Sequence, residues 1–198
     1  RQVSKQIVII QGHPDPEGGH YGHALCAAYA EGARASGHSV EILPVAQLDF
    51  PLLRTKRDFD NGDPPEAIRR CQAAIQAADH LVIIHPLWLG SMPALLKGFL
   101  EQVFRPSFAF ELGEKPGRPG KKLLQGKSAR VIVTMGMPGF AYRWFYGAHA
   151  VKSLERNILA FTGFKPVHRT LIGMVEAEDD SGRQKRLDEV RALGRDAA

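Results

Sequence analysis

The sequence predicts one α/β domain in which a parallel sheet is covered by helices on both faces. Short runs of apolar, largely β-branched residues alternate along the 198-residue chain with helical patterns that are apolar on one side. The apolar runs do not alternate with polar residues, which is typical of strands buried on both faces of a sheet. A chain of this length suffices for one well-buried domain, so we expect a single domain over residues 1–198.

Taken in order, the elements predict a βα repeat. Strands are expected at 6–12, 39–43, 81–84, 130–134 and 167–175, and helices at 22–36, 64–78, 93–103, 148–162 and 180–195. Residues 44–63 read as irregular, and the Gly-, Pro- and Lys-rich segment 105–127 reads as a long excursion. Five such strands fit the doubly wound, flavodoxin-like sheet order 2-1-3-4-5.

Composition limits the classes of partner. The formal net charge is +5, but no aromatic residues are interleaved with the basic ones, so a solvated face is favoured over a nucleic-acid surface. Attraction of phosphate-bearing small molecules is the second interpretation. No apolar run approaches the length of a membrane span. Cys26 and Cys71 belong to no CxxC motif, which predicts a reduced, cytoplasmic setting.

The chain is organised around residues 81–104, where an apolar strand leads through a stiff loop into a helix. The loop, 85–93, holds two prolines and a glycine, so neither helix nor strand continues through it. Its Trp88 is large and apolar, although loops normally lie on the surface. Such a loop either packs under its own neighbours or forms the wall of a site for a flat ligand.

Three unusual loops, 13–23, 85–93 and 134–142, follow the strands whose carboxyl ends meet in this sheet order. The first loop leads into a helix N-terminus, where free N–H groups favour an anion such as phosphate. Its histidines are either donors to that anion or surface residues. In the third loop, backbone N–H groups could face developing negative charge, and Tyr142 and His149 could donate protons. The alternative for this pair is a hydroxyl and an imidazole satisfied within the loop.

A phosphate pocket, a flat apolar wall and a hydrogen-bonding loop together suggest a flavin. The chain also resembles the NAD(P)H:quinone oxidoreductases of the flavodoxin-like fold, which include a flavoprotein partner of bacterial potassium-efflux systems. The segment HPLWLGSMPALLKGFLEQVF is similar to their P-L-x-W/Y-x-x-x-P-A-x-L-K-G-[FW]-x-[DE]-x-V-F signature. Supporting matches are Phe108-Ala109-Phe110, Thr134-Met135-Gly136 and Gly163-Phe164.

The resemblance implies a residue set for the flavin. The phosphate end would be held by His13, His20, Tyr21 and Gly22; the ring would be bordered by Pro86, Leu87, Trp88 and Leu89, and its polar edge by Thr134, Met135, Gly136 and Met137. Tyr142 and His149 match a Tyr/His pair that stabilises the reduced ring. The family's Ser/Thr-Phe-Asn loop is here His20-Tyr21-Gly22, so FAD and FMN both stay open.

The activity that the resemblance implies is ping-pong hydride transfer from NAD(P)H to a quinone or similar acceptor, in a homodimer. Two alternatives are weighed. The protein could be a flavin- or nucleotide-binding regulatory subunit of a membrane transporter. His13-Pro14-Asp15-Pro16-Glu17 also looks like the H-P-D-D-E motif of zinc-dependent deacetylases. Pro16 stands where that motif needs a carboxylate ligand, so no metal site is expected.

Overall fold

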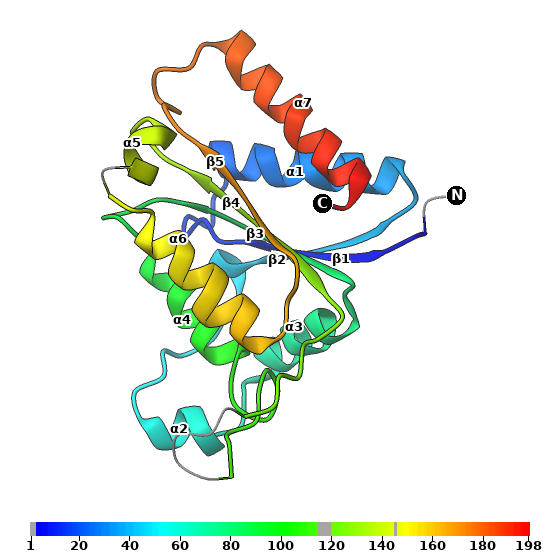
Figure 1. Cartoon of the computed structure of the whole chain (residues 1–198), viewed down its shortest axis with the longest axis vertical. Coiled ribbons are helices and arrows are strands. Elements are labelled where there is room, and N and C mark those ends of the chain that lie inside the picture. The colour runs from blue at the N-terminus through cyan, green and yellow to red at the C-terminus, as the bar shows by residue number, and fades with distance from the viewer. Residues whose placement is uncertain (1–2, 115–119, 145) are drawn as a thin grey trace.

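The computed structural model describes residues 3–114, 120–144 and 146–198. Its centre is one five-stranded, all-parallel sheet in the order β2-β1-β3-β4-β5 (Figure 1). The strands are β1 (Gln6–Gln11), β2 (Ser39–Pro44), β3 (His80–Pro86), β4 (Ser128–Thr134) and β5 (Val167–Ile172). This is the predicted order, and the fold class is confirmed.

Helices cover both faces of the sheet. α1 (Tyr21–Ala35) and α7 (Asp180–Asp196) lie on one face, and α3 (Glu66–Ala77), α4 (Ala94–Val103) and α6 (His149–Ser153) lie on the other (Figure 1). The central strands β1, β3 and β4 are almost wholly buried, because their side chains contribute to two apolar clusters, one under each helical layer. This burial explains why their sequences show no alternation.

Two glycines let α1 and α7 cross at close range. A Cβ on Gly32 of α1 would lie 1.9 Å from the carbonyl oxygen of Arg191 on α7. A Cβ on Gly194 of α7 would lie 2.1 Å from the carbonyl oxygen of Tyr29 on α1. Neither contact is possible for another residue without moving a helix, so the packing of this layer depends on both glycines.

The structure corrects several predicted bounds. β5 ends at Ile172 rather than at 175, because Met174 takes a left-handed φ of 59° and turns the chain out of the sheet. The segment 44–63, expected to be irregular, contains the 3₁₀ turn η1 (Val45–Gln47) and α2 (Lys56–Asn61). α2 begins where the Thr55 side chain accepts a hydrogen bond from the Asp58 N–H.

The segments after β4 also differ from the prediction. The loop expected at 134–142 contains the short helix α5 (Gly139–Trp144). The single helix expected at 148–162 is α6 continued by the π-helix η2 (Leu154–Ala160). Such π turns are rare and no periodicity in the sequence announces them. Within 105–127, the buried Arg105 donates to the carbonyl oxygens of Asp58 and Gly62; residues 115–119 lie outside the described residues.

None of the helices in the described parts of the chain is long and apolar enough to cross a membrane.

Candidate functional site at the carboxyl edge of the sheet

The register of the sheet brings the three unusual loops to one edge. Gln11 at the end of β1 pairs with Ile84 of β3, and Pro86 at the end of β3 pairs with Thr134 of β4. The Leu87 N–H then donates to the Thr134 carbonyl oxygen over 2.8 Å, which joins the second and third loops directly. Parallel strands that end together in this way form the edge where ligands bind in open α/β sheets.

Three histidines gather in the first loop and the first turn of α1. The rings of His13 and His20 are stacked, with centroids 3.9 Å apart and planes 12° apart. The His23 ring lies 5.3 Å from His13 and 5.7 Å from His20. Trp88 of the second loop meets His13 edge to face at 5.8 Å. The residues predicted for the phosphate end and for the apolar wall are therefore neighbours in space.

A chain of hydrogen bonds fixes the first loop. The His13 N–H donates to Gln11 Oε1 over 2.9 Å, and the Asp15 N–H donates to His13 Nδ1 over 3.1 Å. Asp15 Oδ1 accepts the Glu17 N–H, and Asp15 Oδ2 lies 2.6 Å from His20 Nε2. Because His13 Nδ1 accepts a hydrogen bond, the neutral ring carries its proton on Nε2, where it can be donated to a ligand.

The N-terminus of α1 has the features of an anion site. His20 occupies the N-cap position, but its side chain makes no capping hydrogen bond. Beneath this turn lies Gln11, only 4% exposed, whose Nε2 has no hydrogen-bond partner. That nitrogen is 3.9 Å from the point where a Cβ on Gly22 would lie. An uncapped helix start beside a buried, unpaired amide donor fits the phosphate of a nucleotide or flavin.

The electrostatics of the loop follow from burial and from crowding of like groups. Burial, followed by the neighbouring histidines, lowers the pKa of His13. Burial and His20 lower the pKa of His23. The bond to His20 lowers the pKa of the Asp15 carboxyl. Burial and the neighbouring Glu178 carboxylate raise the pKa of Tyr21 to about 12, so its hydroxyl stays protonated at neutral pH.

The second loop exposes its apolar side chains. Trp88 is 51% exposed and Leu89 is fully exposed, whereas Pro86 and Leu87 are half-buried. Paired hydrogen bonds between Trp88 and Ser91 close a two-residue turn, in which Leu89 and Gly90 have φ angles of 47° and 77°. Leucine is disfavoured at such a left-handed position. A strained, exposed leucine beside an exposed tryptophan indicates a surface kept for contact with a ligand or another chain.

Below this loop, His85 is a functional candidate that we did not predict. It is 3% exposed, and burial lowers its pKa to about 4, so the ring is neutral at pH 7. Its Nδ1 lies 2.8 Å from the Pro86 carbonyl oxygen, to which it donates, while Nε2 is buried without a partner. The sequence analysis read Gln11 as part of a strand and His85 as the start of the second loop, whereas the structure places His85 within β3. Their unpaired atoms become visible only in three dimensions.

The residues predicted in the third loop differ in their exposure to solvent. Thr134 and Met135 are buried, Met137 is half-buried and Gly136 is exposed. Of the predicted proton donors, His149 is exposed, whereas Tyr142 is 2% exposed and packs in the core cluster under α6. Burial raises the pKa of Tyr142. In this structure the two side chains therefore do not share one exposed surface.

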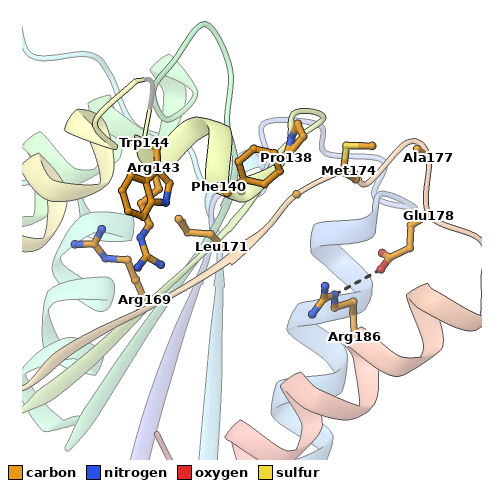
Figure 2. A pocket seen from close by; sticks show the side chains of 12 residues that line it. Pro138, Phe140, Arg143, Trp144, Arg169, Leu171, Met174, Ala177, Glu178 and Arg186 are labelled. Carbon is orange, nitrogen blue, oxygen red and sulfur yellow. Dashed lines mark ion pairs between the residues drawn. The ribbon is translucent and has the colours of Figure 1, made fainter.

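A cavity of about 690 Å³ opens between the third loop and the chain that follows β5 (Figure 2). Phe140 and Trp144 line it from α5, and Met174 lines it from the turn after β5. Its charged residues lie toward opposite ends: Arg143 and Arg169 at one, Glu178 and Arg186, 3.5 Å apart, at the other. These residues carry no sequence motif, and the sequence analysis did not select them.

Among the described residues, no three His, Cys, Asp or Glu side chains are grouped so that they could hold a metal ion. In the first loop the His13 and His20 rings are stacked face to face, and the His23 ring is tilted against both.

Comparison with known proteins identifies the family to which the chain belongs. The model of the Flavodoxin_2 family, described as a flavodoxin-like fold, matches residues 5–193, so the chain belongs to that family. Over 187 residues it is 27% identical to a Haemophilus influenzae protein named "uncharacterized NAD(P)H oxidoreductase", covering 91% of this chain and 90% of the relative.

Two further likenesses are informative. Over 124 residues the chain is 39% identical to the glutathione-regulated potassium-efflux system ancillary protein KefG of Escherichia coli, covering 61% of each. The solved NAD(P)H:quinone oxidoreductase from Methanothermobacter marburgensis superimposes with a TM-score of 0.82 at 24% identity, covering 99% of this chain and 100% of that one. At this identity the superposition shows the shared fold.

Proposed function

We propose that this chain is a flavin-dependent NAD(P)H:quinone oxidoreductase, which passes two electrons from NAD(P)H to a quinone or similar flat acceptor. The main observation behind the proposal is that a candidate phosphate site and a candidate surface for a flat ring lie side by side at the edge of the sheet. An uncapped helix start with a buried, unpaired amide adjoins an exposed apolar wall through the 5.8 Å contact of His13 with Trp88. The relative named as an NAD(P)H oxidoreductase supports the same class of reaction.

In this proposal the first loop binds the phosphate. The backbone N–H groups of Tyr21 and Gly22, at the uncapped start of α1, would donate to its oxygens, together with His13 Nε2 and the Gln11 amide. His20, held by Asp15, would contribute a further donor. FAD and FMN both carry the phosphate that these groups would bind, so both fit the loop.

The second and third loops would hold the ring. Trp88 and Leu89 offer an apolar surface for it, and the backbone of Thr134–Met137 would face its polar edge, as the resemblance implies. When bound, the flavin supplies hydride acceptance at N5 and its return to a second substrate. The protein's contribution is to orient the stacked partners, to exclude water and to stabilise negative charge. We keep Tyr142 and His149 as the proposed proton donors to that charge.

The proposal also covers the oligomeric state of the protein and its location in the cell. Trp88, Leu89, Phe140 and Trp144 are all large, apolar and at least half exposed, which a second copy of the chain would cover. We therefore propose a homodimer. We also propose a cytoplasmic location, which the two buried, free cysteines Cys26 and Cys71 support.

Steady-state kinetics test the proposed reaction. With NADPH or NADH and a soluble quinone varied together, double-reciprocal plots should give parallel lines, because each substrate leaves before the next one binds. Trp88→Ala should raise KM for both substrates, since both would stack against the same wall. A protein with stoichiometric flavin that oxidises neither nicotinamide would contradict the proposal.

The second candidate is a regulatory subunit of a membrane transporter, which the 39% identity to a potassium-efflux ancillary protein favours. Both candidates would bind flavin, so flavin content does not separate them. They differ in whether NAD(P)H reduces the bound flavin at a useful rate. Rapid reduction supports the enzyme, whereas flavin that NAD(P)H leaves oxidised supports the regulatory subunit.

A further inference from the structure

We propose that binding of the flavin phosphate is coupled to proton uptake by His23. This inference rests on the proposed function, because it assigns a role to the same phosphate loop. It is carried by a cluster of three imidazoles around one carboxylate, at a helix start that also holds a buried, unpaired amide donor.

The cluster has more basic groups than it has negative charge to accept. Among the groups whose charges act on the rings, Asp15 is the one carboxylate, and His20 already engages it at 2.6 Å. The His23 ring lies 5.7 Å from that of His20, so a second positive charge is opposed while no anion is present. A phosphate at the start of α1 would supply the missing negative charge.

His13 has a different role in the cluster. Its Nδ1 accepts the Asp15 N–H, so protonation there would break a hydrogen bond that shapes the loop. The ring is also 8% exposed and stacked on His20. His13 therefore acts as a neutral Nε2 donor, and the proton taken up belongs to His23.

Within the described parts of the chain, the charges that act on His13 and His23 all come from the first loop and the first turn of α1. From the second loop the described neighbour is Trp88, which does not titrate. Glu178, which precedes α7, and Arg183 and Arg186 of α7 act on Tyr21 and not on His13 or His23. The balance of the cluster is thus set within the loop itself, by three rings, Asp15 and the bound anion.

The direction in which pH changes the affinity for the phosphate follows from the protons bound in the two states. A bound phosphate raises the pKa values of nearby histidines, so the complex holds more protons than the free protein. Affinity must then rise as pH falls and decline as pH rises through the pKa values of the complex, by up to about tenfold per pH unit for each proton taken up. Above about pH 7 a phosphate monoester is already largely dianionic, because its second pKa is about 6. The ligand itself therefore contributes little in that range.

Titration of the flavin-free protein with FMN and with FAD between pH 6.5 and 8.5 tests the proposal. We expect the dissociation constant to increase about 3- to 10-fold from pH 7 to pH 8. Calorimetry in two buffers with different protonation enthalpies should show net proton uptake. Riboflavin, which has the ring but no phosphate, should show neither effect.

Matched variants assign the proton. The variant His23→Gln should flatten the pH dependence and abolish proton uptake, whereas His168→Gln, an exposed histidine on β5, should change nothing. Tight FMN or FAD binding with no proton uptake would overturn the inference and leave the proposed function standing. Equal slopes for FMN and riboflavin would also overturn it. Failure of both FMN and FAD to bind at every pH would overturn the inference and the proposed function together.

Discussion

His13 and Trp88 meet edge to face, with ring centroids 5.8 Å apart and planes 83° apart. The two residues are 75 positions apart in the sequence. The contact exists because β1 and β3 are neighbours in the sheet and end together. It joins the proposed anion-binding loop to the proposed apolar wall, which are separate motifs in the sequence.

Replacing Leu89 by asparagine should stabilise the protein and weaken the site. Leu89 holds a φ of 47° in a two-residue turn, and asparagine tolerates that conformation far better. We expect the free energy of unfolding to rise by about 1 kcal/mol in urea titrations. Binding of flavin or acceptor should weaken at the same time, because a fully exposed apolar contact is removed. A variant that is less stable would show that the turn is not strained.

Gly32→Ala should destabilise the protein by about 1–3 kcal/mol, as overpacking does. A methyl group there would lie 1.9 Å from the Arg191 carbonyl oxygen and force α1 away from α7. In an exposed helix the same change is stabilising by up to about 1 kcal/mol, so the sign of the effect is diagnostic. Ala27→Ser, on the exposed side of α1, is the matched control and should have little effect. Thermal and urea unfolding provide the measurement.

Acid should destabilise the fold between pH 6.5 and about 4 through two buried histidines. Burial lowers the pKa of His80 to about 3 and that of His85 to about 4, whereas both titrate near 6.5 when unfolded. The unfolded state then binds more protons in this window, and stability falls with pH by up to about 1.4 kcal/mol per pH unit for each histidine.

Urea titrations at several pH values check this acid dependence. His80→Gln should reduce the slope, because its protonation would no longer oppose folding. The control is His149→Gln, an exposed histidine that does not act on His80 or His85, and this variant should retain the slope of the parent chain. If the parent and His80→Gln proteins lose stability equally over this range, His80 is not the titrating group.

Tyr142→Phe and His149→Gln should each lower the rate of acceptor reduction about 100-fold or more, as loss of a proton donor does. Flavin content should not change, because neither residue is proposed to hold the phosphate. Tyr146→Phe, an exposed tyrosine on the same segment, serves as the control. Unchanged turnover in Tyr142→Phe would assign this side chain to the core, where the structure buries it.

Local signals were sufficient for the existence of the five strands and the three loops, and the sheet order followed from fitting the βα repeat to the doubly wound fold. Apolar runs mark buried strands, and Gly and Pro mark where those strands stop. The same signals placed His13, His20 and Trp88 at one edge, and the structure brings these three together.

The rest depends on contacts that no local pattern contains. The unpaired nitrogens of Gln11 and His85 arise from what surrounds them, and neither the predicted strand that contains Gln11 nor the predicted loop that begins at His85 indicates them. The cavity beside Phe140 and Arg169 is built from α5, β5 and the turn after it, where the chain carries no motif. The strand predicted at 167–175 is too long by three residues. Val175 continues the apolar pattern of the sequence, whereas the backbone leaves the sheet after Ile172.

The central claim is that this edge of the sheet binds a flavin that NAD(P)H reduces. The most direct measurement is an anaerobic visible spectrum of the flavin-loaded protein, before and after NADPH and then after a quinone. We predict that NADPH bleaches the flavin absorbance and that the quinone restores it. A loaded protein whose absorbance NADPH and NADH leave unchanged would contradict the enzymatic account, and a protein that takes up no flavin would contradict the site itself.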